Sequence, residues 1–162
     1  MKKIPKVLVL LSSFVLAQLA GLIGSVFTID SISTWYQALL KPSWTPPAWV
    51  FGPVWLTLYT LMAISAYLIW EKRNKAHADL ALKIYAMHLA INALWSIVFF
   101  GMQDVAMALL IIIVLWFLIV GMMILFYPIR RAAAWLLAPY LIWVSLAISL
   151  NVGILALNYA KT

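Results

Sequence analysis

The stretch VAMALLIIIVLWFLIVGMMILFYPI, residues 105–129, has 25 consecutive residues without a charged side chain. A helix of about 20 apolar residues is long enough to cross the hydrocarbon core of a bilayer. Four further uncharged stretches contain 20 to 29 residues each and cover 7–29, 42–70, 84–103 and 132–160. The 162-residue chain is 67% hydrophobic and only 9% charged, with a mean hydropathy of +1.09, so it is far more apolar than a soluble domain. The sequence therefore predicts five membrane-spanning helices.

We predict an all-α integral membrane protein with a single domain, residues 1–162, folded as a five-helix bundle. The expected helices cover about 7–27, 46–70, 80–100, 105–127 and 132–158. Short links make sequential helices antiparallel neighbours. The basic start followed by an apolar run also fits a secretory signal. That run continues to Thr28, which favours a retained first helix.

The distribution of lysine and arginine predicts the topology. Nine of the eleven fall in the amino terminus, in 72–83 and in 130–131, and only Lys41 and Lys161 fall on the other side. The positive-inside rule then places the amino terminus in the cytoplasm and the carboxyl terminus outside. Because topology accounts for most of the net charge of +7, we expect no nucleic-acid partner. The expected location is the cell (inner) membrane if the source is prokaryotic.

The segment KPSWTPPAWVFGPVW, residues 41–55, combines three tryptophans with four prolines. Proline is tolerated in the first turn of a helix, where its missing amide hydrogen has no intrahelical acceptor. We therefore expect Thr45 to cap the second helix and the two following prolines to begin it. Pro53 falls inside that helix and is expected to disturb the backbone near the outer surface.

Polar and aromatic residues recur at helical spacing on three of the predicted helices. An amide has no partner in lipid, so the asparagine-bearing faces should point into the bundle. In the outer half they would converge on an aromatic pocket for a flat, largely apolar ligand. A purely structural core remains an alternative, since asparagine also links helices. The stripes are Phe51, Trp55, Tyr59 and Met62; Tyr85, His88, Asn92, Trp95, Ser96 and Phe99; and Tyr140, Trp143, Ala147, Asn151, Ile154 and Asn158.

Signals for catalysis and metal binding are weak. The chain has no cysteine, and its four carboxylates lie at predicted helix edges, so no intramembrane acid-base pair is expected. His88 has no second histidine or acidic residue at ligand spacing. Small residues four apart, at Ala17 and Gly21, Ala20 and Gly24, and Ala86 and Ala90, fit either packing within the bundle or a dimer interface.

Three motifs together resemble the translocator protein family, also called the tryptophan-rich sensory proteins or peripheral-type benzodiazepine receptors. They are KPSWTPPAWVFGPVWLTLYTLM, INALWSIVFFG and APYLIWVSLAISLN, and the resemblance covers nearly the whole chain. It implies a membrane bundle, commonly dimeric, that binds protoporphyrin IX and haem as ligands and, in animal members, cholesterol and synthetic compounds. By matching motifs, the implied ligand contacts are Phe51, Trp55, Asn92, Trp95, Trp143 and Ala147, with Tyr36 in the loop.

The leading hypothesis is a non-enzymatic tetrapyrrole-binding protein that acts as sensor or transporter in porphyrin handling and stress response, with no required cofactor. In this hypothesis Trp55, Trp95, Phe99 and Trp143 stack on the macrocycle, and Asn92 and Asn151 orient its polar edge. The expected partners are the tetrapyrrole or another flat hydrophobic ligand, membrane lipid and a second copy of the chain. The alternatives are light- or oxygen-dependent porphyrin breakdown by the pocket tryptophans, and a structural or regulatory membrane role. The sterol motif of animal members is not matched, so cholesterol transport is not predicted.

Overall fold

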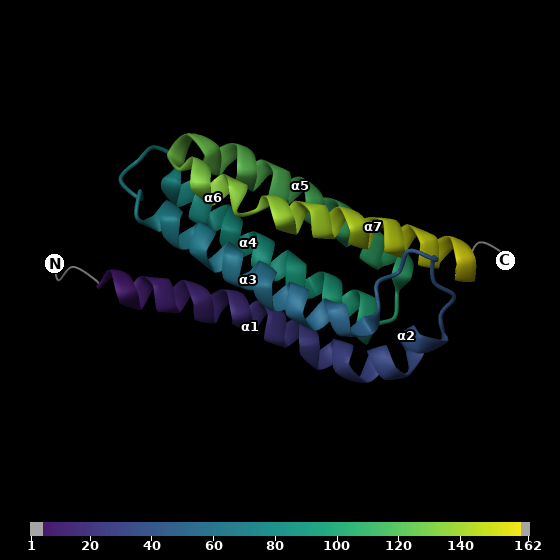
Figure 1. Ribbon diagram of the computed structural model, residues 1–162. Coiled ribbons are helices and arrows are strands. Elements are labelled where there is room, and N and C mark those ends of the chain that lie inside the picture. The colour runs from purple at the N-terminus through teal and green to yellow at the C-terminus, as the bar shows by residue number, and fades with distance from the viewer. Residues whose placement is uncertain (1–4, 160–162) are drawn as a thin grey trace.

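The computed structural model describes residues 5–159. It contains helices joined by short turns and one longer connection, residues 34–47, which includes α2 (Figure 1). The elements in chain order are α1 (Lys6–Ser33), α2 (Trp35–Ala38), α3 (Ala48–Trp70), α4 (Ala78–Ser96), the π-helical turn η1 (Ile97–Gly101), α5 (Val105–Ile129), α6 (Arg131–Trp135) and α7 (Ala138–Tyr159). Five segments are long and apolar enough to span a membrane, as the sequence predicts.

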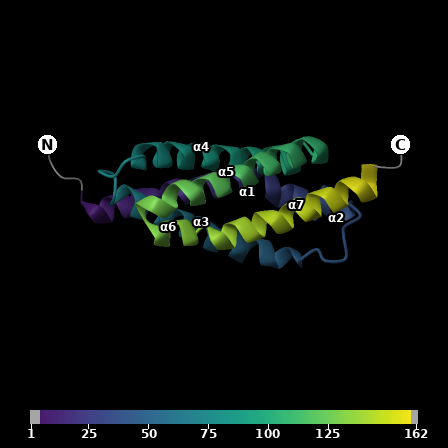
Figure 2. The same cartoon turned by 90° about the horizontal axis from the view of Figure 1, so that it is seen from above.

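The helices form three layers along the bundle. α3 and α4 lie in the middle, α5, α6 and α7 cover one side, and α1 covers the other (Figures 1 and 2). α1 packs on α3 and α4, whereas α5 packs on α4 and α7. The described chain begins and ends at opposite ends of the bundle, as five crossings require. Which end faces the cytoplasm stays a prediction.

Several predicted boundaries are wrong by a few residues. α1 continues to Ser33, six residues beyond the expected end, and the connection then forms the short α2. α3 begins at Ala48, and Thr45 does not cap it, because the Thr45 hydroxyl donates instead to the carbonyl of Pro42 at 2.7 Å. α3 runs through Pro53 without interruption.

The fifth span is divided where one continuous helix was expected. Leu136 and Leu137 form a turn between α6 and α7, and Pro139 follows in the first turn of α7. Proline clashes with the backbone of the preceding turn, which explains why the helix restarts here. α6 is tied to the middle layer because the Ser65 hydroxyl donates to the carbonyl of Ala133 at 2.8 Å.

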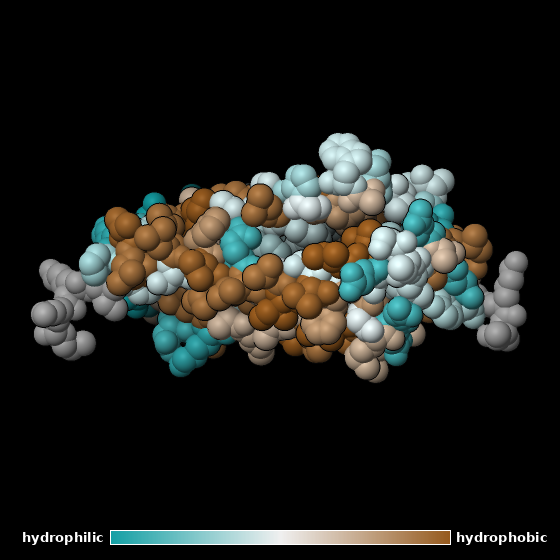
Figure 3. Space-filling view, turned by 90° about the horizontal axis from the view of Figure 1, so that it is seen from below, coloured by the Kyte–Doolittle hydropathy of each residue, from teal (hydrophilic) through white to brown (hydrophobic). Residues whose placement is uncertain are grey.

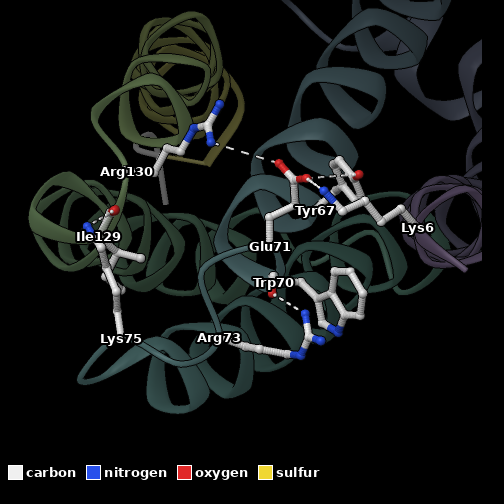
Figure 4. Close-up of polar contacts among 8 residues, drawn as sticks. All are labelled: Lys6, Tyr67, Trp70, Glu71, Arg73, Lys75, Ile129 and Arg130. Atoms are coloured by element: carbon white, nitrogen blue, oxygen red, sulfur yellow. Dashed lines mark hydrogen bonds and ion pairs between the residues drawn. The ribbon is translucent and has the colours of Figure 1, made fainter. Parts of the chain in front are cut away.

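A polar cluster joins three helices at the end of the bundle where α1 begins (Figure 4). The Glu71 carboxylate, just after α3, accepts from the Lys6 ammonium at 2.9 Å and lies 3.8 Å from the Arg130 guanidinium. The Tyr67 hydroxyl donates to the same carboxylate at 3.3 Å. One carboxylate therefore connects the first turn of α1 to the end of α3 and to the link between α5 and α6.

Candidate functional site

A cavity of about 620 Å³ lies between α1, α3, α4 and α7. Its volume is within the range of small-molecule sites, about 300 to 1,000 Å³. The wall is mostly apolar and aromatic, and none of the lining side chains, all within residues 5–159, carries a charge. The site therefore suits a ligand whose enclosed part is uncharged and largely apolar.

Aromatic rings from α3 and α7 form one side of the cavity. The Trp55 ring stacks on Tyr59 with centroids 5.5 Å apart and meets the edge of Tyr140 at 6.2 Å. Phe51, one turn earlier on α3, meets the ring of Trp143 on α7 edge-on at 5.7 Å. Edge and stacked contacts of this kind hold rings at defined angles. α3 and α7 thus present a pre-formed aromatic surface.

Behind this surface a hydrogen-bond network fixes the amide of Asn92. The Tyr59 hydroxyl donates to Asn92 Oδ1, and Asn92 Nδ2 donates to the Tyr140 hydroxyl at 2.8 Å. The Tyr140 oxygen also lies 3.0 Å from His88 Nε2. The network joins α3, α4 and α7, so the predicted interhelical role of asparagine applies here. Asn92 nevertheless also lines the cavity.

Trp95 supplies a polar group whose hydrogen-bonding capacity is not used by its neighbours. Its indole stacks on Phe99 at 5.4 Å, and its side chain lines the cavity. Within the described part of the chain, the buried Nε1 atom has no hydrogen-bond partner. A buried donor without an acceptor is costly.

The structure brings six of the nine predicted site residues into the cavity wall. They are Phe51, Trp55, Asn92, Trp95, Trp143 and Ala147. Asn151 lies elsewhere, and its Nδ2 donates to the carbonyl of Val105 at 2.8 Å, which fixes α7 to the start of α5.

The placement of Phe99 differs from the expectation because the helix changes its winding. The stripe assumes a regular α-helix, but residues 97–101 form the π-helical turn η1. A π-turn adds a residue to the turn and rotates every later side chain. Phe100 consequently lines the cavity, while Phe99 is 2% exposed and packs at 4.8 Å from the Phe100 ring.

Tyr36, the loop candidate, is a buried residue of α2 that lies outside the cavity wall. Its ring contacts Phe99 at 6.2 Å, and burial raises the pKa of its hydroxyl. The Lys41 ammonium donates to the carbonyls of Tyr36, Gln37 and Leu39, at 2.7, 3.1 and 2.8 Å. Lys41 therefore satisfies carbonyl groups at the end of α2 and stabilises the conformation of the connection.

The connection is fastened to the carboxyl-terminal half of α7. The Asn158 side chain exchanges two hydrogen bonds with the backbone of Leu40, at 3.0 and 2.9 Å. The Trp44 indole donates to the Ser149 hydroxyl at 3.2 Å. A side chain at Gly153 would collide with the Pro42 ring. These contacts hold the connection against α7.

α1 supplies much of the cavity wall, which the sequence analysis missed. Its lining residues include Phe14, Gln18, Gly21, Leu22, Ser25, Thr28 and Ile29. Gln18, Gly21, Ser25 and Thr28 are spaced by three or four residues, so they share one helical face. Polar residues on one face of an otherwise apolar span were the available signal.

The small residues of α1 are used inside the bundle. Ala17 is fully buried, and a side chain at Gly21 would collide with the Tyr59 ring. A Cβ at Gly24 would lie 3.0 Å from that of Ser96. Ala86 and Ala90, by contrast, lie exposed on α4. A homodimer stays a prediction.

His88 is fully buried behind Asn92 and does not line the cavity. Within residues 5–159, no group of three histidine or acidic side chains could hold a metal ion. The arrangement therefore offers rings for stacking and a few polar atoms, and supplies no set of metal ligands along the wall.

The fold and the site define an all-helical membrane protein with an aromatic cavity between its spans. Residues 13–157 match the TspO/MBR family. The chain is 41% identical over 139 residues to tryptophan-rich protein TspO of Chlorobaculum tepidum. This alignment covers 85% of this chain and 88% of that protein. It is 37% identical to protein CrtK of Rhodobacter capsulatus, with 90% and 89% covered, and 37% identical to the human translocator protein, with 85% and 83% covered.

The chain therefore belongs to the TspO/MBR family, and the resemblance inferred from its motifs is confirmed. The five spans together with this membership identify an integral membrane protein. The names of these relatives describe a translocator and a tryptophan-rich protein, and a relative from Cereibacter sphaeroides is named a tryptophan-rich sensory protein. None of these names describes an enzyme.

Proposed function

We propose that the protein binds a tetrapyrrole such as protoporphyrin IX or haem in the cavity between α1, α3, α4 and α7, and acts as sensor or transporter in porphyrin handling. The observation that carries the proposal is the aromatic surface of Trp55, Phe51 and Trp143 beside a cavity of about 620 Å³. A flat conjugated ring gains dispersion and quadrupole contacts on such a surface. Another type of macrocycle with similar size and polarity would fit the same surface.

The distribution of polarity gives the bound ring an orientation. The wall carries no charge, and an unpaired carboxylate is costly to enclose there. The carboxylates of a porphyrin would therefore stay at the mouth, and the apolar edge would lie inside.

Binding explains the site better than catalysis does. The wall offers tryptophan, tyrosine and asparagine but no carboxylate or histidine for acid-base chemistry. The relatives carry names for sensing and translocation. We therefore propose a binding protein, and porphyrin breakdown by the pocket tryptophans is not favoured.

A glycine pair gives the sharpest test. A Cβ at Gly52, in the cavity wall, meets no atom within 4 Å, so the side chain of Gly52→Phe begins in open space beside the cavity. Gly121→Phe is the matched control, since Gly121 is equally open but lies on α5 outside the wall. Protoporphyrin IX would be titrated in nanodiscs while its absorbance band is followed.

We expect saturable binding by the wild type and by Gly121→Phe. Gly52→Phe should weaken affinity about tenfold or more, which corresponds to about 1.4 kcal/mol. Trp55→Ala should also weaken binding, because it removes the stacking surface. Equal affinity for the two phenylalanine variants, or no saturable binding by the wild type, would contradict the proposal.

A further inference from the structure

The cavity reaches the lateral surface of the bundle between α1 and α3. Leu22 on α1 and Leu56 on α3 both line the cavity, yet they are 60% and 59% exposed. Gly52, one turn before Leu56, also lines the cavity and is exposed. In the face that α1 presents, a recess with pale side chains lies beside the brown side chains of α1 (Figure 3).

This opening lies at the depth of the hydrocarbon core. Leu56 is eight residues beyond Ala48, the first residue of α3, so it lies about 12 Å along the helix at 1.5 Å per residue. Leu22 is eleven residues before Ser33, the last residue of α1. Both positions fall inside segments that span the membrane. The medium at the rim is therefore lipid acyl chain.

Contacts on either side of the opening keep its width defined. Toward the beginning of α1, the Gln18 amide donates to the Thr60 hydroxyl at 3.3 Å and closes the seam with α3. Toward the end of α1, the hydrogen bonds go to the α4–η1 segment, from the Thr28 and Ser96 hydroxyls at 3.1 Å and from Ser31 to the carbonyl of Phe100 at 2.6 Å. α1 therefore bonds to α3 at the level of Gln18 and to the α4–η1 segment at the level of Thr28 and Ser31. Between these two levels the gap beside α3 stays open.

The beginning of α1 is also bonded to the bundle. The gap therefore does not arise because α1 has separated from the other helices. Residues 6–16 contain no buried residue, but Lys6 pairs with Glu71 at 2.9 Å (Figure 4). The connection before α3 is bonded to α7 through Asn158 and Ser149.

We propose that the ligand enters and leaves the cavity from the hydrocarbon core of the bilayer, through the opening between α1 and α3. The proposal rests on the proposed function and assigns the ligand a further property. The ligand is a molecule that partitions into the membrane before it binds. Ser25 and Gly52 both line the cavity, and the antiparallel register set by Gln18 and Thr60 puts them at about the same level on α1 and α3.

The first experiment closes the opening covalently. The chain has no cysteine, so the double variant Ser25→Cys/Gly52→Cys can be bridged by a short bismaleimide without competing thiols. The control is Lys6→Cys/Glu71→Cys, bridged by the same reagent at the salt bridge outside the cavity. Porphyrin transfer from preloaded vesicles would be followed by stopped-flow fluorescence, and bridging verified by mass spectrometry.

We expect the bridge across the opening to slow association and dissociation about tenfold each, so the ratio of the two rates changes little. The bridged control should transfer porphyrin at the wild-type rate. An unchanged rate in the fully bridged Ser25→Cys/Gly52→Cys protein would overturn the lateral route. Loss of binding at equilibrium by the wild type would instead contradict the proposed function.

A second measurement tests the opening without any porphyrin. Ala147→Cys places a single thiol on the α7 side of the cavity for a nitroxide label, and Gly121→Cys gives a lipid-facing reference. The label at position 147 should collide often with oxygen, which is concentrated in lipid, and rarely with a water-soluble nickel chelate. Frequent collision with the chelate, or with neither, would overturn the lateral opening.

Discussion

The two ends of the bundle are built from the same helices but are packed differently. At the end where α3 finishes, Met62 and Ile69 belong to the same buried cluster as Ile119 and Phe126 of α5, and all four side chains are fully buried. We call this region the close-packed end. At the end where α3 begins, the first buried residue is Leu58, and the helices surround the cavity.

The difference follows from the size and stiffness of the facing side chains. At the close-packed end, alanines alternate with flexible aliphatic side chains, which interdigitate and let helices approach. At the cavity end, Phe51, Trp55 and Trp143 are rings held edge to face or stacked, and they border a space of about 620 Å³ that side chains leave unfilled. Packing therefore carries stability at one end and leaves room for a ligand at the other.

The largest effect is expected from Phe126→Ala at the close-packed end. The side chain is fully buried, and its removal should lower the free energy of unfolding by about 3 kcal/mol. Phe117→Ala, on the same helix but 65% exposed, should cost much less. Unfolding in mixed micelles titrated with sodium dodecyl sulfate would measure both. Equal losses for the two variants would refute the contrast in packing.

Gly21→Ala tests the contact between α1 and the cavity wall. The new methyl group would overlap the Tyr59 ring, which cannot turn away freely because it stacks on Trp55 and bonds to Asn92. We expect a loss of about 2 kcal/mol, as for other overpacked sites. Gly121→Ala, in open space, is the control for the same unfolding assay. Wild-type stability of Gly21→Ala would show that α1 can move away from α3 at little cost.

Tyr140→Phe tests the network behind the cavity. It removes the oxygen that accepts from Asn92 and contacts His88, and it leaves buried polar atoms without that partner. We expect a loss of about 1 kcal/mol in the free energy of unfolding. Tyr127→Phe, at a half-exposed ring on α5, should leave stability unchanged. A neutral Tyr140→Phe would mean that the network does not join the helices energetically.

The smallest effect concerns pH and the cluster at Glu71. The hydrogen bond from Lys6 holds the pKa of Glu71 below its ordinary value of 4.5. A lowered pKa in the folded state adds stability above pH 4.5, and this is lost as the pH falls through the folded-state value. Glu71→Gln should remove that part of the pH dependence of unfolding. Asp79→Asn, which breaks the exposed pair with Lys83, is the control variant for the same unfolding measurement. Equal pH profiles for Glu71→Gln and the wild type would refute the prediction.

The fold was predictable because a bilayer imposes strict requirements on the sequence. Spans must be long and uncharged, so the charged residues alone placed five helices within a few residues of their observed bounds. One predicted bound was wrong where a side chain had two similar hydrogen-bond partners available. Thr45 could cap α3 or bond to Pro42, and only the folded connection shows that it bonds to Pro42.

The cavity wall that forms the candidate site was predictable in part, for the same physical reason. Asn92 had to face the protein because an amide finds no partner in lipid, and the aromatic residues at helical spacing from it followed. Phe99 was misplaced relative to the cavity because the π-helical turn at 97–101 has no signature in side-chain spacing. Asn151 also faced inward, but its partner is the backbone of α5.

The sequence by itself determined the number of spans, the inward faces of α4 and α7, and the aromatic character of the segment that opens α3. The tertiary structure decided that α1 forms a wall of the cavity and that the cavity opens beside α3. In water, an apolar side chain indicates the protein interior. In a membrane, acyl chains and a ligand cavity are equally apolar, so Leu22 and Leu56 carry no mark in the sequence that distinguishes one from the other.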